Sequence, residues 1–312
     1  MHKLTLKTNK KTLTFKKGFE EFILDCKARG LREATIKHYI EAYQQIKKYI
    51  DPDIEIDKIN VKKFKEFIVK SSDGNRNSQT IYSLTRDFKT IIHFFMKCNY
   101  IEKFDMKLPK VDKHPIETYT DEELERLLKK PDIKKCSFCD YRNYVIVCFF
   151  LSTGIRLSSL INIKIVDLKL SESEVEILHT KNRKPLTVPL NSNIKKILAE
   201  YLTYRQSSNK DDYLFCNVYG KQLKKSTIIQ AVQSYNWSRG VNTTSIHKLR
   251  HTFAKKWILG GNSVVALQKI LGHSSLQMTQ NYINILVSDL KKDVDNYNIL
   301  QEFSKSFIKM KK

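Results

Sequence analysis

Residues 271–282 read LGHSSLQMTQNY, the most informative stretch of the chain. It ends in Tyr282 and contains His273, nine residues earlier. Two shorter stretches precede it, TGIR at residues 153–156 and HKLRHTFA at residues 247–254. Each has an ordinary explanation by itself, because Tyr282 is one of 15 tyrosines and the chain has 56 lysines and arginines. Their combination and order indicate a chemistry.

Together the three stretches supply the side chains that a metal-free phosphodiester transesterification needs. The guanidiniums of Arg156 and Arg250 can hold the non-bridging oxygens of a phosphate and neutralise charge in the transition state. His247 and His273 can donate to the same oxygens or move protons near neutral pH. Tyr282 can act as the nucleophile once its hydroxyl is deprotonated, which requires a base and concentrated positive charge nearby.

These stretches resemble the motifs of the tyrosine recombinase family, which includes phage integrases and Xer-type site-specific recombinases. The resemblance spans nearly the whole chain. It implies that Arg156 and Arg250 are the two catalytic arginines and that His247 is the histidine of the HxxR box. Tyr282 matches the nucleophile, and His273 matches a position held by His or Trp.

The resemblance also implies a lysine on a β-hairpin as the general acid for the leaving 5′ oxygen. Lys181 fits this position better than Lys184, because it lies eight residues before Pro189 of a VPL run. His251, next to the second arginine, is expected to pack or to support its neighbours rather than to act in catalysis. Ser159 departs from the family pattern, which has Glu or Asp three residues after the first arginine.

The implied reaction joins Tyr282 to a DNA 3′ phosphate and releases a 5′ hydroxyl. A 5′ hydroxyl of a partner duplex then reverses the step, and two such rounds pass through a Holliday junction. No metal or nucleotide cofactor is required. The expected partners are double-stranded DNA with inverted-repeat core sites and three further copies of the chain, in a tetramer on two DNA sites. The scheme leaves room for an accessory DNA-bending protein.

Composition agrees with a nucleic-acid partner. The formal net charge of +23 attracts a polyanion over long range. A Lys-rich proteome is the alternative explanation for this charge. The six cysteines are scattered, and Cys136 and Cys139 form a lone CxxC without the two further ligands of a zinc site. No apolar run is long enough to span a bilayer. These features predict a cytoplasmic protein of bacterial, phage or mobile-element origin, with no membrane partner.

The expected fold is mainly α with a small β-sheet, arranged as a two-domain DNA clamp. The predicted parts are a basic N-terminal extension at 1–12, a helical core-binding (SAM-like) domain at 13–105, a linker at 106–118, a catalytic domain at 119–292 and a C-terminal tail at 293–312. The tail carries Leu300, Phe303, Phe307 and Met310 on one helical face, so it is a candidate for docking on a neighbouring protomer.

Apolar spacing predicts four helices in the first domain, with Ser78 as the cap of the fourth. In the second domain, Thr120 and Glu123 form a capping box, and residues 144–150 read as a buried helix. Residues 175–178 and 186–189 read as strands of a hairpin. Helices are then predicted at 194–204, 225–235, 246–259, 263–271 and 276–282.

Several functions remain open within this chemistry. Integration and excision of a mobile element is the leading hypothesis, and Xer-type dimer resolution is the alternative in the same class. A type IB topoisomerase would use similar side chains but act alone and reseal the same strand. A non-catalytic DNA-binding relative is a third alternative, because a fold does not guarantee activity.

Overall fold

The computed structural model describes residues 13–74, 76–111, 116–180, 184–207, 209–242, 244–280 and 282. The chain forms two compact units, unit 1 at residues 1–114 and unit 2 at residues 115–312. The described residues are mostly helical with one three-stranded sheet, which confirms the predicted fold class. Lys181 and the tail at 293–312 lie outside the described residues.

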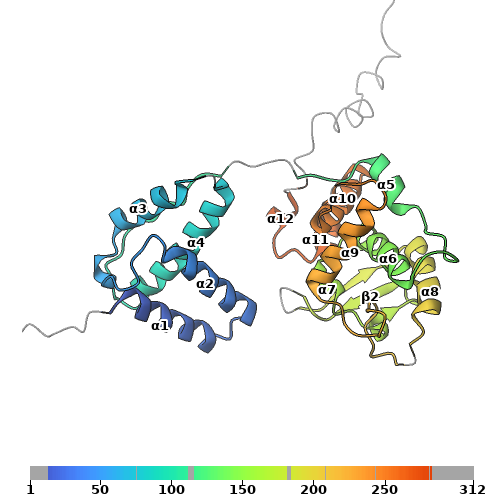
Figure 1. Ribbon diagram of the computed structural model, residues 1–312, viewed down its shortest axis with the longest axis horizontal. Helices are drawn as coiled ribbons and strands as arrows, with labels where there is room; N and C mark the ends of the chain where they lie inside the picture. The colour runs from blue at the N-terminus through green and yellow to red at the C-terminus, as the bar shows by residue number, and fades with distance from the viewer. Residues whose placement is uncertain are drawn as a thin grey trace, which may run out of the picture. The chain divides into compact units, whose positions relative to one another are not determined.

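Unit 1 is built from helices whose apolar faces meet in a Phe-rich core (blue to cyan in Figure 1). The ring of Phe15 lies edge-on to Phe88 and Phe95, which come from the far end of the unit's sequence. This confirms the four predicted helices. They are α1 (Phe15–Ala28), α2 (Glu33–Ile46), α3 (Val61–Ser72) and α4 (Ser78–Lys97), with a 3-10 turn at Ile56–Lys58.

The cap of α4 corrects one prediction. Asn77, not Ser78, is the N-cap: its side chain accepts a hydrogen bond from the backbone N–H of Gln79 at 2.8 Å. Asn77 has the extended backbone of a cap, whereas Ser78 is the first helical residue. Both residue types satisfy the free N–H groups of a helix start, so sequence alone placed the boundary one residue late.

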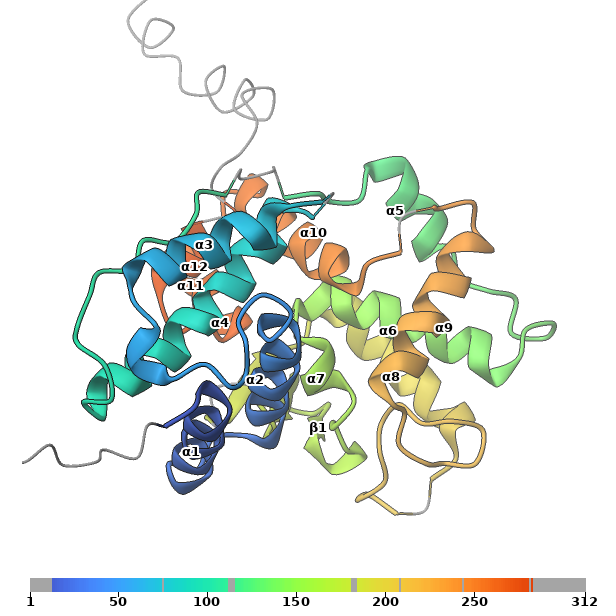
Figure 2. The ribbon, with the colours of Figure 1, turned by 60° about the vertical axis from the view of Figure 1, so that its left-hand side comes forward.

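Unit 2 is organised around α6 (Phe138–Thr153), which is apolar on all sides and therefore buried on all sides. α5, α8, α9 and α10 all lie against it (Figure 2). α6 extends beyond the predicted stretch 144–150 at both ends. The other helices of unit 2 are α5 (Asp121–Leu128), α7 (Leu157–Leu160), α8 (Ser192–Arg205), α9 (Lys225–Trp237), α10 (Ile246–Leu259), α11 (Val264–Leu271) and α12 (Leu276–Gln280), with a 3-10 turn at Ile165–Asp167.

A small antiparallel sheet lies beside these helices. Its strands are β1 (Leu168–Lys169), β2 (Glu174–Ile177) and β3 (Leu186–Pro189), in the order β1-β2-β3. Val175 pairs with Val188, and both side chains are fully buried. This confirms the predicted hairpin, whereas β1 was not predicted because two residues carry no alternation.

Two contacts attach the start of unit 2 to α10. The Thr120 side chain and Glu123 form the predicted capping box of α5. One residue earlier, the backbone N–H of Tyr119 donates to Thr252 Oγ1 at 2.9 Å. Lys248 lies over the Tyr119 ring at 5.0 Å. α10, which carries the HKLRHTFA stretch, is thus held by Tyr119, just before α5, and by α6. Among the described residues, no helix is long and apolar enough to cross a membrane.

Candidate active site

The TGIR stretch forms the turn that leads out of α6. Gly154 caps the helix with a left-handed backbone, φ 59°. A Cβ at this position would lie 2.3 Å from the Phe253 ring and 2.8 Å from Leu271, so no larger residue fits. The chain therefore reverses here against α10 and α11, and Arg156 emerges two residues later as the N-cap of α7.

Arg250 reaches the same turn from α10. Its side chain is buried, with 5% of the residue exposed. Nη1 donates to the carbonyl oxygen of Gly154 at 2.6 Å, and Nη2 donates to the carbonyl oxygen of Leu271 at 3.0 Å. Arg156 Nη1 donates to the carbonyls of Leu271 and Gly272 at 3.3 and 3.4 Å. The two guanidiniums thus share one acceptor, the Leu271 carbonyl.

This acceptor lies at the C-terminal end of α11. Gly272 ends the helix with a left-handed backbone, φ 60°, which leaves the last carbonyls unpaired by the helix itself. Helix C-termini carry partial negative charge and attract cations. Within the described residues, no carboxylate forms a salt bridge with Arg156 or Arg250. Ser159 donates to the His179 carbonyl at 3.4 Å. Backbone carbonyls therefore orient Arg156 in this chain.

The two arginines form a concentrated and uncompensated positive charge. Burial, and then the charge of Arg156, lower the pKa of Arg250 to about 10. Burial also lowers the pKa of Arg156. A guanidinium with a pKa of about 10 is still charged at neutral pH, and two guanidiniums side by side without a carboxylate favour an anion. In the described part of the chain Arg156 has no partner on Nε or Nη2, which leaves a bidentate donor fork for an oxyanion.

His273 follows the Gly272 cap and is fixed at both ring nitrogens. Nε2 lies 2.8 Å from Arg250 Nη2, and Nδ1 lies 2.8 Å from Thr279 Oγ1. Since the guanidinium can only donate, Nε2 accepts and Nδ1 carries the proton. Burial, with smaller effects of Arg250 and Arg156, lowers the pKa of His273 to about 4. The ring is therefore neutral at pH 7.

Tyr282 lies two residues beyond α12, against the same histidine. Its ring is parallel to the His273 ring, with 2° between the planes and 6.2 Å between the centroids. It also packs on the small apolar cluster that contains Phe253 and Trp257. The Tyr282 hydroxyl lies 3.0 Å from Nδ1 of His251. The sequence reasoning missed this contact, although the HxxRH spacing placed His251 one helical turn after His247.

His247 is exposed on α10, and its ring centroid lies 6.4 Å from that of His251. It makes no hydrogen bond to another residue in the described part of the chain. An exposed imidazole at the edge of the site is free to meet a ligand. Its position is consistent with donation to a phosphate oxygen.

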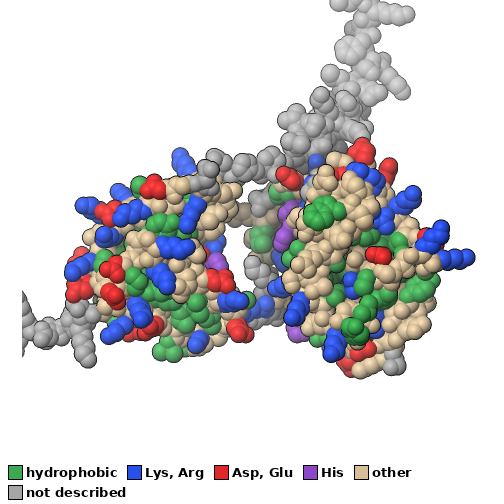
Figure 3. Space-filling model, in the orientation of Figure 1, with side chains coloured by type: hydrophobic (Ala, Val, Ile, Leu, Met, Phe, Trp, Pro, Cys, Tyr) green, Lys and Arg blue, Asp and Glu red, His purple; other side chains and the backbone are tan. Residues whose placement is uncertain are grey.

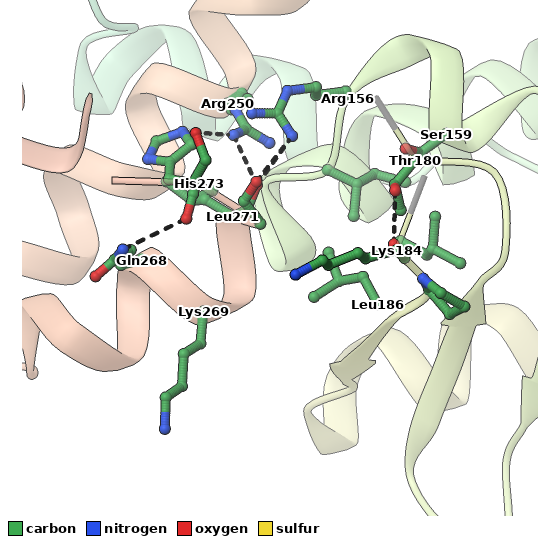
Figure 4. A pocket seen from close by; sticks show the side chains of 15 residues that line it. Arg156, Ser159, Thr180, Lys184, Leu186, Arg250, Gln268, Lys269, Leu271 and His273 are labelled. Carbon is green, nitrogen blue, oxygen red and sulfur yellow. Dashed lines mark hydrogen bonds between the residues drawn. The ribbon is translucent and has the colours of Figure 1, made fainter. Parts of the chain in front are cut away.

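The arginines and His273 line a pocket of about 570 Å³ (Figure 4). Thr180, Lys184 and Leu186 line it from the hairpin side. The Lys184 side chain points into the pocket in Figure 4, and Thr180 Oγ1 donates to the Lys184 carbonyl at 2.6 Å. The structure thus brings together Arg156, Arg250, His273 and Tyr282 with His251, which was not among the predicted catalytic residues. It does not describe the position of Lys181.

Nothing in the described part of the chain has the composition of a metal centre. No group of three or more His, Cys, Asp or Glu side chains gathers there. Cys136 and Cys139 are free thiols, and Cys136 has a raised pKa because it is partly buried. The pocket is lined by cationic donors, which suit an anionic ligand rather than a cation.

A family model, two relatives and a solved structure of known proteins are all similar to this chain. Residues 117–288 match the model of the phage integrase family. A tyrosine recombinase of Pseudothermotoga lettingae is 29% identical over 296 residues, which cover 91% of this chain and 98% of that protein. The tyrosine recombinase XerD of Oceanobacillus iheyensis is 27% identical over 283 residues, which cover 86% of this chain and 94% of that protein. A solved structure of the Tn1549 transposon integrase with transposon right end DNA has a TM-score of 0.75 at 19% identity, covering 91% of this chain and 99% of that one.

Proposed function

Because the chain belongs to the phage integrase family, and so is a tyrosine recombinase that cleaves and rejoins DNA, we propose that it recombines specific sites through a 3′-phosphotyrosyl intermediate. The observation that carries this proposal is the pair of uncompensated guanidiniums, Arg156 and Arg250, beside His273 and Tyr282. An anion site next to a tyrosine hydroxyl is what attack on a phosphodiester requires.

In the proposed reaction, the scissile phosphate lies between the two guanidiniums. Arg156 offers its free donor fork to the non-bridging oxygens, and Arg250 adds charge from a buried position where it is weakly screened. His247 and His273 flank these oxygens. The Tyr282 oxygen attacks phosphorus and the 5′ oxygen leaves, with Lys181 proposed as its proton donor. Lys184 remains the alternative acid, since it lines the pocket.

The proposed DNA partner is a duplex with inverted-repeat core sites. Lys and Arg side chains are spread over the visible face of each unit (Figure 3), and the net charge is +23. Such a surface binds phosphates mainly through counterion release. We assign the core-binding role to residues 13–105 and the chemistry to residues 119–292. Strand exchange between two sites calls for a tetramer, in which the tail at 293–312 docks on a neighbour.

Integration and excision of a mobile element is the biological role that we favour. Support comes from the fold likeness to a transposon integrase and from Ser159, which departs from the family pattern. Dimer resolution of the Xer type is the second candidate, supported by the XerD relative. The two roles differ in where the target lies: at the ends of a movable segment, or at one chromosomal site.

Covalent capture tests the proposal. The protein is incubated with fragmented, nicked DNA from its source, denatured in SDS, and the attached DNA is sequenced. Adducts that depend on Tyr282 and concentrate at one inverted repeat are expected, and the Tyr282→Phe variant should give none while still binding DNA. Adducts at element ends support the mobile-element role, and adducts at one chromosomal locus support resolution. Scattered adducts would indicate a topoisomerase. Absence of adducts from protein that binds DNA would indicate a non-catalytic relative.

A further inference from the structure

The Tyr282 hydroxyl has a histidine nitrogen as its neighbour. His251 Nδ1 lies 3.0 Å from the hydroxyl oxygen, within hydrogen-bond distance. The two rings are tilted by 50° with centroids 5.4 Å apart, so the contact is made through the edge of the imidazole. When the ring carries its proton on Nε2, the hydroxyl donates to Nδ1.

The other two histidines of the site are not arranged to take this proton. His273 lies parallel to the Tyr282 ring, and its two nitrogens are engaged by Arg250 and Thr279. His247 is exposed and makes no hydrogen bond to Tyr282 in the described part of the chain. His251 is thus the histidine of the site that has a ring nitrogen within hydrogen-bond distance of the Tyr282 hydroxyl.

We propose that His251 is the general base that takes the proton from Tyr282, an inference that rests on the proposed function. The Tyr282 O–H bond breaks and its proton moves to His251 Nδ1. The phenolate oxygen forms a bond to phosphorus, and the bond from phosphorus to the 5′ oxygen breaks. The leaving oxygen takes a proton from the hairpin lysine. When a 5′ hydroxyl attacks the phosphotyrosine, the protonated His251 returns the proton to the departing phenolate.

The surroundings of His251 fit this role. Burial, and then the neighbouring His247 and Arg250, lower its pKa to about 4, so the ring is unprotonated at neutral pH. Arg250 also interacts with the Tyr282 hydroxyl, where it stabilises the phenolate that forms. A phosphate bound at Arg250 brings negative charge that opposes these cations. Substrate binding therefore raises the pKa of His251 and makes it a stronger base when the reaction begins.

The test compares cleavage by wild-type protein and by His251→Asn. Asparagine retains a hydrogen-bonding group near the Nδ1 position but cannot take up a proton. The substrate is a nicked duplex carrying the site recovered by covalent capture, saturating and in a single turnover. We expect the rate of adduct formation to fall by about 10²- to 10⁴-fold. Gln230→Asn, at an exposed residue of α9 that does not line the pocket, is the control and should leave the rate unchanged.

A second substitution separates catalysis from structure. Fluorotyrosine at position 282 has a more acidic hydroxyl and depends less on a base. It should therefore restore much of the cleavage rate in His251→Asn, and it should change the rate of the wild-type protein only slightly. A rate within a few-fold of wild type in His251→Asn, or a loss that fluorotyrosine does not restore, would overturn the inference. If the wild-type protein itself forms no adducts, the proposed function fails, and this inference fails with it.

A spectroscopic measurement covers the case in which His251→Asn does not fold. In ¹⁵N-histidine NMR spectra of the DNA-free wild-type protein, Nδ1 of His251 should be unprotonated near pH 7 and should shift in Tyr282→Phe. A protonated Nδ1, or an Nδ1 signal that does not change when the Tyr282 hydroxyl is removed, would contradict the role of His251 as the base.

Discussion

At the residue scale, the identity of the general acid is the most direct question. Lys181 is proposed from its place in the family pattern, whereas Lys184 lines the pocket and points into it. Replacing the bridging 5′ oxygen with sulfur removes the need for an acid, because a thiolate leaves unprotonated. We expect Lys181→Ala to lose about 10²- to 10⁴-fold in cleavage of the normal substrate and to recover on the sulfur substrate. The same recovery in Lys184→Ala, with Lys181→Ala active on both substrates, would assign the role to Lys184.

The neutral His273 makes stability depend on pH. Its pKa is about 4 in the folded chain and about 6.5 in an unfolded one, so the unfolded state binds the proton first. This contribution to the free energy of unfolding is complete above about pH 6.5 and declines as the pH falls towards 4. Urea denaturation should therefore show that the free energy of unfolding falls more steeply between pH 7.5 and 4 for the wild-type protein than for His273→Gln. Parallel curves for the two proteins would refute the neutral assignment.

At the element scale, the turn after α6 holds the site together. Gly154 has a left-handed backbone, its carbonyl oxygen accepts a hydrogen bond from Arg250, and a methyl group added to it would meet the Phe253 ring. Gly154→Ala is expected to cost at least about 1–3 kcal/mol of the free energy of unfolding. It should also lower the rate of cleavage, because Arg250 loses its position.

Gly220 provides the matched control for this substitution. It has the same left-handed backbone, φ 76°, but nothing lies within 4 Å of an added Cβ. Gly220→Ala should cost only about 1 kcal/mol and leave cleavage unchanged. Equal losses of stability and activity in the two variants would show that packing against Phe253 contributes nothing.

The elements themselves were largely predictable. Apolar periodicity gave the helices of unit 1 and the hairpin of unit 2, because each buries one face. The failures have local causes. β1 is too short to show alternation, the N-cap of α4 had two suitable neighbours in Asn77 and Ser78, and α6 is apolar on every side, so its ends carried no periodic signal.

At the scale of the whole molecule, assembly is the property to test. The tail at 293–312 is proposed to dock on a neighbouring protomer through Leu300, Phe303, Phe307 and Met310, and it lies outside the described residues. Truncation after Asp295 should abolish the tetramer on paired sites and strand exchange, while binding to a single site remains. Native gel shifts measure single-site binding with one-site DNA and tetramer formation with two-site DNA. Undiminished synapsis by the truncated chain would refute tail docking.

The sequence by itself determined the fold class and the reaction class, because helix periodicity is local and the side chains proposed for catalysis lie in short motifs of fixed order. The tertiary structure decided how those side chains meet. Arg156 is oriented by a carbonyl 115 residues away, and His251 reaches the hydroxyl of Tyr282 across 31 residues. Such contacts depend on where α6 and α11 end and on how α10 packs between them. A motif specifies which groups are present, but only packing specifies which nitrogen faces which oxygen.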